Sequence, residues 1–232
     1  MSIAIVSGAS RGLGLELVAQ LLARRWRVIA GCRKTQVLRL TELAGARPGR
    51  LHVMPLDVAS ERSIAAFAGE ASIVTDHVDL LINNAGVLHS GERYGQLVAK
   101  TLVESFTVNA AGALLLTQAC TGLLRQAQAA RVVNVSTVMA SMARTETFRT
   151  PSYAMSKAAL NMATRLLAAE LGPQGICVAS VHPGWVQTDM GGTAAPLSVE
   201  AAATALLDRA VTLGLDDSGR FIASDEGALL PW

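Results

Sequence analysis

Short apolar runs alternate with longer amphipathic stretches along the whole of this 232-residue chain. The runs are β-branched or leucine-rich, lack polar alternation and are bounded by turn residues, which is typical of strands buried on both faces of a parallel sheet. They cover residues 3–7, 27–31, 51–56, 79–83, 131–136 and 176–181, and a final piece at 220–224 would add an edge strand. Helical patterns lie between them, at 14–25, 60–71, 95–127, 152–171 and 198–214.

This alternation predicts a single α/β domain over residues 1–232. The expected architecture is a Rossmann-type, doubly wound parallel sheet of about seven strands with helices on both faces and right-handed crossovers. In such sheets, ligands bind beyond the carboxyl ends of the strands, where the strand order reverses. The residues that directly follow each apolar run are therefore the candidates for function.

Composition narrows the class of protein further. Hydrophobic residues make up 51% of the chain and charged residues 16%, which favours a large core and excludes disorder. A net charge of +2 is too small to indicate a nucleic-acid or membrane-surface partner. Cys32, Cys120 and Cys177 lack metal-ligand spacing, so we expect reduced core thiols and no metal site. With no charged leader and no apolar run near 18 residues, the chain is expected to be cytoplasmic.

A glycine-rich turn, Ser7–Gly14, follows the first apolar run. Its glycines permit a tight turn, close backbone approach and close packing of the next helix, whose N-terminal N–H groups would face a phosphate. Glycine turns also arise for steric reasons alone. Its position between a first strand and a first helix favours the binding of a dinucleotide pyrophosphate.

The second apolar run ends in "AGCRK" (30–34) and contains no acidic residue that would hold a ribose 2′-hydroxyl, as NAD-preferring sites usually do. Arg33, and Arg11 in the glycine turn, would instead suit a 2′-phosphate, since a guanidinium can donate two parallel hydrogen bonds to phosphate oxygens. The alternative is a pair of solvated arginines. The sequence therefore favours NADP over NAD.

The later runs also end in residues suited to a dinucleotide. Asp57 follows the third run and would accept a hydrogen bond from an adenine amino group. "NNAG" (83–86) is small enough for close approach to a ribose, and Pro183-Gly184 would lie against a nicotinamide. The fifth run ends at the hydroxyl pair Ser136 and Thr137.

Tyr153 and Lys157 are four residues apart and so share one face of their predicted helix. An ammonium group beside a phenol favours the phenolate, and we expect it to lower the pKa of Tyr153 from about 10 toward neutrality. Tyr153 would then be a proton donor or acceptor. An ordinary helical tyrosine beside a solvated lysine is the alternative, which the glycine turn and "NNAG" disfavour.

Taken together, these pieces resemble the short-chain dehydrogenase/reductase family over nearly the whole chain. The matching pieces, in order, are Ser7–Gly14, Asp57, residues 83–86, Asn109 in "VNAAG", the pair 136–137, Tyr153 with Lys157, and Pro183-Gly184 with Thr188. "SKAALNM" (156–162), "HPGWVQTDMGG" (182–192) and the ending "GALLPW" resemble the C-factor and sniffer-type carbonyl reductase branch. Ser7 stands where the family usually has threonine, and Thr137 stands where it usually has its active-site serine.

The resemblance implies reversible hydride transfer between NADPH and a carbonyl or alcohol, with Tyr153 as general acid or base. Lys157 would tune Tyr153 and hold the nicotinamide ribose, Asn109 would support Lys157 through a water, and Thr137 would bind the substrate oxygen. The implied cofactor-binding residues are Gly8, Ser10, Arg11, Gly12, Leu13, Gly14, Arg33, Asp57, Val58, Asn83, Ala85, Gly86, Tyr153, Lys157, Pro183, Gly184, Val186 and Thr188. The family also implies a homodimer or homotetramer that pairs helices near 95–127 and 152–171.

The substrate pocket is expected to be lined by residues 87–94, 138–150 and 185–197. Apolar side chains in and beside these segments suit a modest aldehyde or ketone, although each would serve equally well as packing: Met139, Met142, Phe148, Trp185 and Met190. Residues 188–198 are predicted to form a mobile lid. An alternative function is a dinucleotide-binding sensor or signalling protein with little turnover. A nucleotide-sugar epimerase or dehydratase is disfavoured, because the chain has no room for the larger substrate domain of such proteins.

Overall fold

The central sheet has seven strands in the order β3-β2-β1-β4-β5-β6-β7, and every neighbouring pair is parallel. We describe it from a computed structural model that covers residues 1–232. The strand order reverses between β1 and β4, so the carboxyl ends of these two strands define the expected binding crevice. The predicted fold class, a Rossmann-type doubly wound sheet, is confirmed.

Each predicted strand is present within one or two residues of its expected bounds. Most strand residues are buried, as the continuous apolar runs require. The strands are β1 (Ile3–Ser7), β2 (Arg27–Cys32), β3 (Leu51–Pro55), β4 (Leu80–Asn83), β5 (Arg131–Val135), β6 (Cys177–His182) and β7 (Phe221–Ala223).

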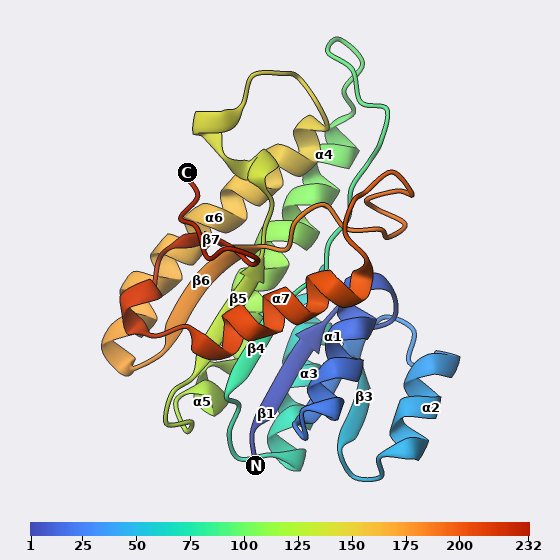
Figure 1. Ribbon diagram of the computed structural model, residues 1–232, viewed down its shortest axis with the longest axis vertical. Helices are drawn as coiled ribbons and strands as arrows, with labels where there is room; N and C mark the ends of the chain where they lie inside the picture. Colours follow the sequence, from blue (N-terminus) through green and yellow to red (C-terminus); the bar gives the residue numbers. More distant parts are fainter.

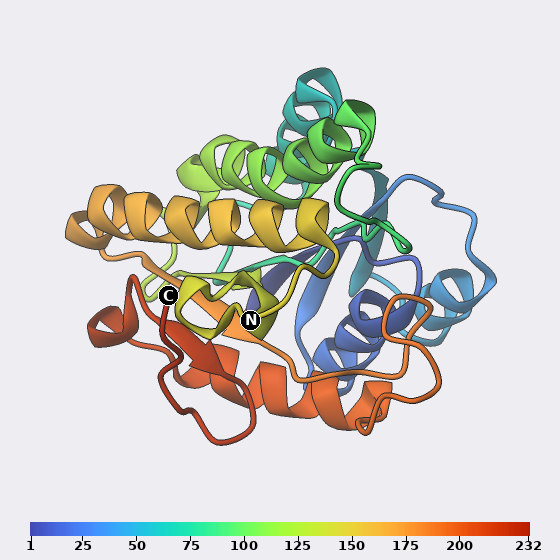
Figure 2. The ribbon, with the colours of Figure 1, turned by 90° about the horizontal axis from the view of Figure 1, so that it is seen from above.

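Helices cover both faces of the sheet and give three layers, as Figure 2 shows from above. One face carries α1 (Gly12–Ala23), α2 (Leu38–Ala46) and α7 (Val199–Thr212); the other carries α3 (Glu61–Val74), α5 (Gly112–Leu124) and α6 (Pro151–Leu171) (Figure 1). Each face has its own core, with Leu21 and Leu206 in the first and Phe67 and Leu116 in the second. All three cysteines are free and buried, as predicted.

The helix expected over residues 95–127 is shorter and is interrupted. It begins with α4 (Ala99–Phe106), passes through a π-helical turn at Thr107–Ala111 and continues as α5 to Leu124. By length and composition alone, the run Ala99–Leu124 is apolar enough to cross a membrane, with a mean hydropathy of 1.3, contrary to the sequence-based expectation. Here α5 packs against α3 and α6, and its buried residues Leu116, Cys120 and Leu124 belong to the core on that face.

The short helix α2 was not expected from the sequence. Leu40 is the only fully buried residue of α2. The helix packs at the edge of the sheet beside β3, and most of its surface therefore faces solvent. One buried side chain in nine residues gives too little periodicity to predict a helix.

A row of hydrogen-bonded polar side chains crosses the buried face of the sheet under α6. Asn83 Nδ2 donates to Asn134 Oδ1 at 2.8 Å, and Asn134 Nδ2 donates to Thr164 Oγ1 at 2.8 Å. The hydroxyls of Thr164 and Ser180 are also 2.8 Å apart. Because buried polar groups are costly when unpaired, this row is stable only as a connected set.

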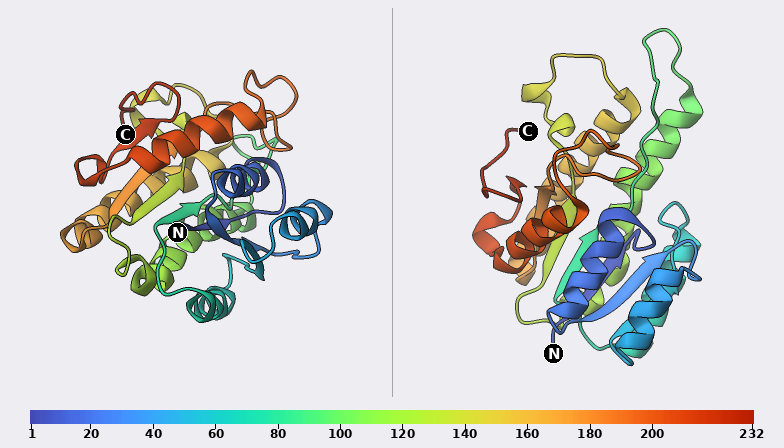
Figure 3. Two further views of the ribbon diagram at one scale, coloured as in Figure 1. Left: turned by 60° about the horizontal axis from the view of Figure 1, so that its bottom comes forward. Right: turned by 45° about the vertical axis from the view of Figure 1, so that its right-hand side comes forward.

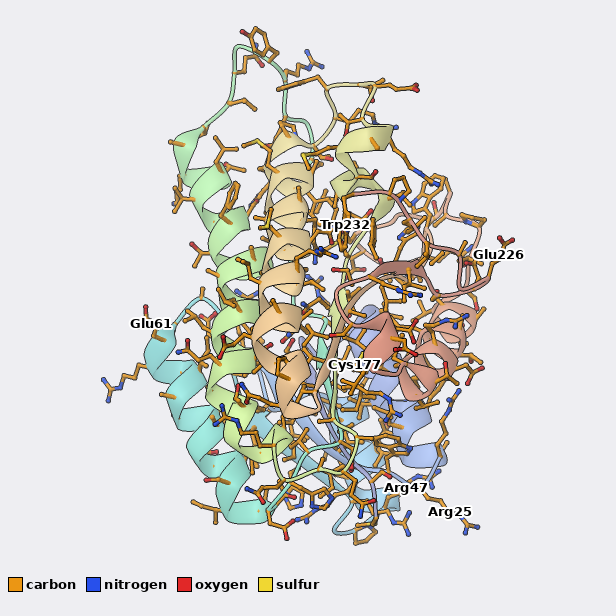
Figure 4. All side chains as sticks on the ribbon, turned by 90° about the vertical axis from the view of Figure 1, so that its left-hand side faces the viewer. Arg25, Arg47, Glu61, Cys177, Glu226 and Trp232 are labelled. Carbon is orange, nitrogen blue, oxygen red and sulfur yellow. The ribbon has the colours of Figure 1, made fainter.

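The loops that follow β4, β5 and β6 gather at one end of the molecule, opposite the N-terminus (Figure 3). Trp232, labelled in Figure 4, stacks on Phe221 with ring centroids 5.6 Å apart. Its main-chain oxygen accepts a hydrogen bond from Ala143 N–H at 3.0 Å, so Trp232 supports the loop after β5.

Candidate active site

The glycine turn after β1 is braced by the turn after β4. Ser7 Oγ accepts hydrogen bonds from the N–H groups of Asn84 and Ala85, each at 3.1 Å. In return, Asn84 Nδ2 donates to the carbonyl oxygens of Ser7 and Gly8, at 3.0 and 3.3 Å. Asn84 was absent from the predicted site residues, although its place in "NNAG" beside the reversal point was a usable signal.

The start of α1 has the features of a phosphate cradle. The backbone N–H groups of Gly12, Leu13 and Gly14 have no acceptor within the chain, and the first turn contains no acidic residue. Such a helix start carries a partial positive charge that favours an anion. Gly8 has φ +68°, and a Cβ there would lie 2.8 Å from Ala85 Cα, so only glycine lets the two turns approach. These residues fit a dinucleotide pyrophosphate.

The two arginines expected at a 2′-phosphate differ in their surroundings. Arg11 Nη1 forms an ion pair with Asp189 Oδ2 at 2.6 Å, with both side chains about three-quarters exposed, at 73% and 76%. Arg33 directly follows β2, is exposed and has no ion pair. Arg33 therefore has no competing acidic partner, whereas the Arg11 guanidinium already donates to Asp189.

The residues after β3 lie beside the same end of the sheet. Asp57 N–H donates to Ser63 Oγ at 2.9 Å, and Asp57 Oδ1 accepts from Ala59 N–H at 3.0 Å, which fixes the carboxylate at the start of the loop. Val58 is buried and packs against Gly112 of α5. Asp57 keeps its second oxygen for an outside donor, while Val58 also serves as packing.

The structure separates the two halves of "NNAG". The Asn83 side chain is in the core, where Nδ2 also donates to Thr117 Oγ1 at 3.0 Å. Gly86 lies instead at the centre of the expected site. A Cβ at Gly86 would be 3.2 Å from Asn109 Oδ1 and 3.8 Å from Lys157 Nζ, so this turn, Asn109 and Lys157 meet there.

Asn109 lies in the π-helical turn and is almost fully buried. Its side chain pairs with the Val87 backbone, accepting from N–H at 2.8 Å and donating to the carbonyl oxygen at 2.9 Å, and it also donates to Ser156 Oγ. Asn109 thereby joins the chain after "NNAG" to α6. Its water-mediated support of Lys157 remains a prediction.

The hydroxyl pair after β5 divides as strand alternation predicts. Ser136 Oγ donates to Asn161 Oδ1 at 2.7 Å within the core under α6. Thr137 Oγ1 accepts a hydrogen bond from Met139 N–H at 3.3 Å and keeps its own proton free. Thr137 begins the turn Val138–Ala140, against which α6 packs, so Thr137 is the hydroxyl available to an outside oxygen.

Tyr153 and Lys157 share one face of α6, as predicted. Lys157 Nζ is 5.9 Å from the centre of the Tyr153 ring and donates to the Val135 carbonyl oxygen at 2.7 Å. The Tyr153 hydroxyl has no hydrogen-bond partner within the chain. Its oxygen is not fully enclosed, so it is open to an outside partner.

The expected lowering of the Tyr153 pKa by Lys157 is wrong for the chain by itself. Burial raises the pKa of Tyr153 to about 12, because the surrounding protein disfavours the charged phenolate. Burial also lowers the pKa of Lys157 to about 8. Removal from water therefore outweighs the attraction between the two groups. Tyr153 carries its proton at neutral pH, and Lys157 is cationic below about pH 8.

The loop after β6 folds back over the glycine turn. Gly184 has φ +86° and lies against Leu197, and Val186 forms a bridge with Leu197. Thr188 Cγ2 is 3.3 Å from where a Cβ of Gly12 would be, so Thr188 covers the start of α1. Hydrogen bonds within the loop, such as Gln187 N–H to the Leu197 carbonyl oxygen at 2.9 Å, give it a defined shape, and its movement as a lid stays a prediction.

Apolar side chains surround this end of the molecule. Those at least partly exposed include Met142, Phe148, Trp185 and Met190, from the segments expected to line a substrate pocket. Phe148 meets Tyr94 edge to face, with ring centroids 5.6 Å apart, and so joins the loop after β5 to the loop after β4.

Comparison with known proteins gives a consistent result. The family model for short chain dehydrogenases matches residues 2–196. C-signal of Myxococcus xanthus is 40% identical over 167 residues, which cover 72% of this chain and 99% of that protein. The structure of the carbonyl reductase Sniffer of D. melanogaster superposes with a TM-score of 0.93 at 31% identity, over 100% of this chain and 99% of that chain.

A second solved structure, the NADPH-bound carbonyl reductase from chicken fatty liver, superposes with a TM-score of 0.92 at 33% identity, over all of both chains. The residues that the family model matches include the glycine turn, Asn109, Tyr153 and Lys157. The chain belongs to the short-chain dehydrogenase/reductase family of oxidoreductases and is of its C-factor and sniffer type.

Proposed function

We propose that this protein is an NADP(H)-dependent carbonyl reductase that interconverts a carbonyl and an alcohol, with Tyr153 as general acid or base. The observation that carries the proposal is the unpaired Tyr153 hydroxyl on the same helical face as Lys157, whose Nζ lies near the turn that holds Gly86. The two solved structures compared above superpose over the full chain and are of carbonyl reductases, one of them with bound NADPH.

The cofactor would be held at the carboxyl ends of β1 to β4. The free N–H groups of Gly12, Leu13 and Gly14 would receive the pyrophosphate, Arg33 the 2′-phosphate and Asp57 the adenine. Arg33, with no acidic residue at the end of β2, supports NADP over NAD. When bound, the nicotinamide supplies the hydride for the carbonyl carbon.

The chain's own residues would supply the proton for the carbonyl oxygen and stabilise the charge that its transfer leaves. Tyr153 carries its proton at neutral pH, as a general acid in the reductive direction requires, and would donate it to the carbonyl oxygen. Thr137 would donate a second hydrogen bond to that oxygen. Lys157, cationic below about pH 8, would stabilise the phenolate that remains.

The substrate would be a modest apolar aldehyde or ketone. Met142, Phe148, Trp185 and Met190 supply apolar surface beside the expected reaction site, and the exposure of these side chains favours an open pocket. The adaptable methionines favour breadth of substrate over strict shape selection.

The experiment is reduction of a panel of aldehydes and ketones, followed through NADPH absorbance, by the wild-type protein and Tyr153→Phe. The substitution removes the hydroxyl and keeps the buried ring, so folding should be retained. We expect kcat to fall about 10²–10⁴-fold, the usual contribution of a positioned proton donor. Reduction that is equally fast in Tyr153→Phe would overturn the proposal.

A second candidate is a signalling protein of the same fold that binds a dinucleotide with little turnover. The 40% identity with a protein named C-signal favours it, and threonine at position 137 is compatible with weak catalysis. The same panel separates the two candidates. A signalling protein would bind NADPH in a fluorescence titration, but none of the carbonyls in the panel would lead to NADPH oxidation.

We also propose a cytoplasmic homodimer or homotetramer formed through α4 and α6. Val103 on α4 and Met155, Met162 and Leu166 on α6 are each more than half exposed, although they are apolar. The two helices pack side by side, so these residues give one surface suited to a second copy. Sedimentation of the wild-type protein and Leu166→Glu tests it, since the charge should produce monomers.

A further inference from the structure

The helix that carries Tyr153 begins without a cap of its own. Thr150 occupies the N-cap position of α6 in the left-handed region, at φ 40° and ψ 56°, which is uncommon for a β-branched residue. Its side chain makes no capping hydrogen bond, and its Oγ1 is enclosed without a partner. A threonine N-cap normally has extended backbone and accepts from an N–H two or three residues on.

A residue from a distant loop caps this helix instead. Glu92 Oε2 accepts a hydrogen bond from Ser152 N–H at 3.2 Å and a second from Ser152 Oγ at 2.8 Å, across 60 positions of sequence. A carboxylate at the start of a helix also interacts favourably with the helix dipole. Glu92 Oε1 is enclosed and unpaired, so the side chain is held inside the structure by its bonds to Ser152.

These contacts lie next to the proposed acid. Ser152 is fully buried and directly precedes Tyr153, in the first turn of α6. Glu92 belongs to the loop that follows the "NNAG" turn, and in the same region Tyr94 meets Phe148 edge to face. Two contacts therefore join this loop to the segment around the start of α6.

We propose that Glu92 is a positioning residue that fixes the first turn of α6 and, through it, the Tyr153 hydroxyl; this inference rests on the proposed function. Without Glu92, the strained backbone at Thr150 is free to relax and the first turn loses its cap. Lys157 lies one turn further along and has its own bond to the Val135 carbonyl oxygen, so it should move less. The expected defect is a displaced phenol beside an intact lysine and cofactor cradle.

The experiment compares Glu92→Ala, Glu92→Gln and the control Ser60→Ala. Glutamine keeps one oxygen that can accept both bonds from Ser152, whereas alanine keeps none. Ser60 caps α3 by accepting from Ser63 N–H at 3.3 Å, so its loss removes a cap from a helix that carries no proposed catalytic residue. Each variant is assayed for kcat and KM at saturating NADPH, for NADPH affinity by fluorescence, and for amide hydrogen exchange.

We expect Glu92→Ala to lower kcat about 10- to 100-fold, the scale of a reacting group displaced by about 1 Å, with KM and NADPH affinity changed less than about threefold. Exchange should rise in peptides covering the start of α6. Glu92→Gln should restore kcat to within about threefold of wild type, and Ser60→Ala should lose stability without losing kcat.

Equal kcat in Glu92→Ala and wild type, or faster exchange spread over the whole chain, would overturn the positioning role. Loss of kcat in Glu92→Gln equal to that in Glu92→Ala would also overturn it, because the charge and not the cap would then matter. Failure of the proposed function is distinguishable, since it would leave wild type inactive or Tyr153→Phe fully active.

Discussion

Lys157 Nζ lies 5.9 Å from the centre of the Tyr153 ring, and both side chains are largely buried. Burial lowers the pKa of Lys157 to about 8, below its ordinary value of 10.5. Between these two values the unfolded chain binds more protons than the folded one, so the free energy of unfolding rises with pH. From pH 7 to 9.5 we expect a gain of about 2 kcal/mol from this group.

The control is Lys157→Met, which keeps an unbranched apolar stem and should lack this gain. Urea unfolding at both pH values gives the difference between the two proteins. The Tyr153 pKa, raised to about 12 from 10.0, has the opposite effect, since stability falls as pH rises from 10 to 12. Measurements below pH 10 avoid it. Parallel pH profiles for wild type and Lys157→Met would contradict the prediction.

Replacing Thr137 by alanine is expected to lower activity, whereas replacing Ser136 by alanine is expected to lower stability. Thr137→Ala removes a donor to the substrate oxygen and should lower kcat about 10²–10³-fold with little change in Tm. Ser136→Ala leaves Asn161 Oδ1 without its donor in the core, which should cost about 1–3 kcal/mol of stability and little kcat. Steady-state kinetics and thermal unfolding on both variants test the assignment, and the reverse pattern would transfer the role to Ser136.

Gly14 and Gly122 form a matched pair of helical glycines. A Cβ at Gly14 would meet the Gly8 carbonyl oxygen and lie 2.5 Å from Asn84 Nδ2, whereas a Cβ at Gly122 would meet nothing within 4 Å. Gly14→Ala should therefore cost about 1–3 kcal/mol and weaken NADPH binding, because α1 must move away from the turn. Gly122→Ala should stabilise the protein by about 0.5–1 kcal/mol. Urea unfolding of both variants measures the difference.

Asp189 is predicted to compete with the cofactor for Arg11. Asp189→Asn breaks an exposed ion pair of 2.6 Å and removes a negative charge near the expected 2′-phosphate. NADPH affinity should rise up to about fivefold, because an exposed ion pair contributes about this much free energy. NADH affinity should not change. The control is Asp208→Asn, which breaks the 2.7 Å pair with Arg24 near the other end of α1. Equal gains for NADPH and NADH would contradict this assignment of Arg11.

The strands were predictable because both faces of the sheet are covered, which makes each strand a continuous apolar run. The bounds of α6 were predictable, since the helix expected over 152–171 is found at Pro151–Leu171, but α2 was not, since it buries one side chain at the sheet edge. The π-helical turn at Asn109 was also missed. It is stabilised by contacts with Val87 and Ser156, which no local pattern reveals.

The same division holds for the site. Residues that follow strands, such as Gly86, could be placed because the topology gathers strand ends at one edge. Asn84 also follows a strand and could have been placed in the same way, whereas Glu92 could not, because it acts through hydrogen bonds to a residue 60 positions away. The direction of the Tyr153 pKa was wrong because depth of burial was unknown, and that depth decides whether desolvation or a nearby ammonium is the larger effect.

The buried row from Asn83 to Ser180 has a consequence for the alignment of the strands. Parallel strands joined by helices receive no register from a tight turn, so side chains must supply it. Asn83 stands directly opposite Asn134 between β4 and β5, and Asn134 directly opposite Ser180 between β5 and β6. A slip of one residue would turn an amide onto the wrong face. By fixing the register of β4, β5 and β6, the row also fixes where these strands end, and therefore the relative positions of the three loops that follow them.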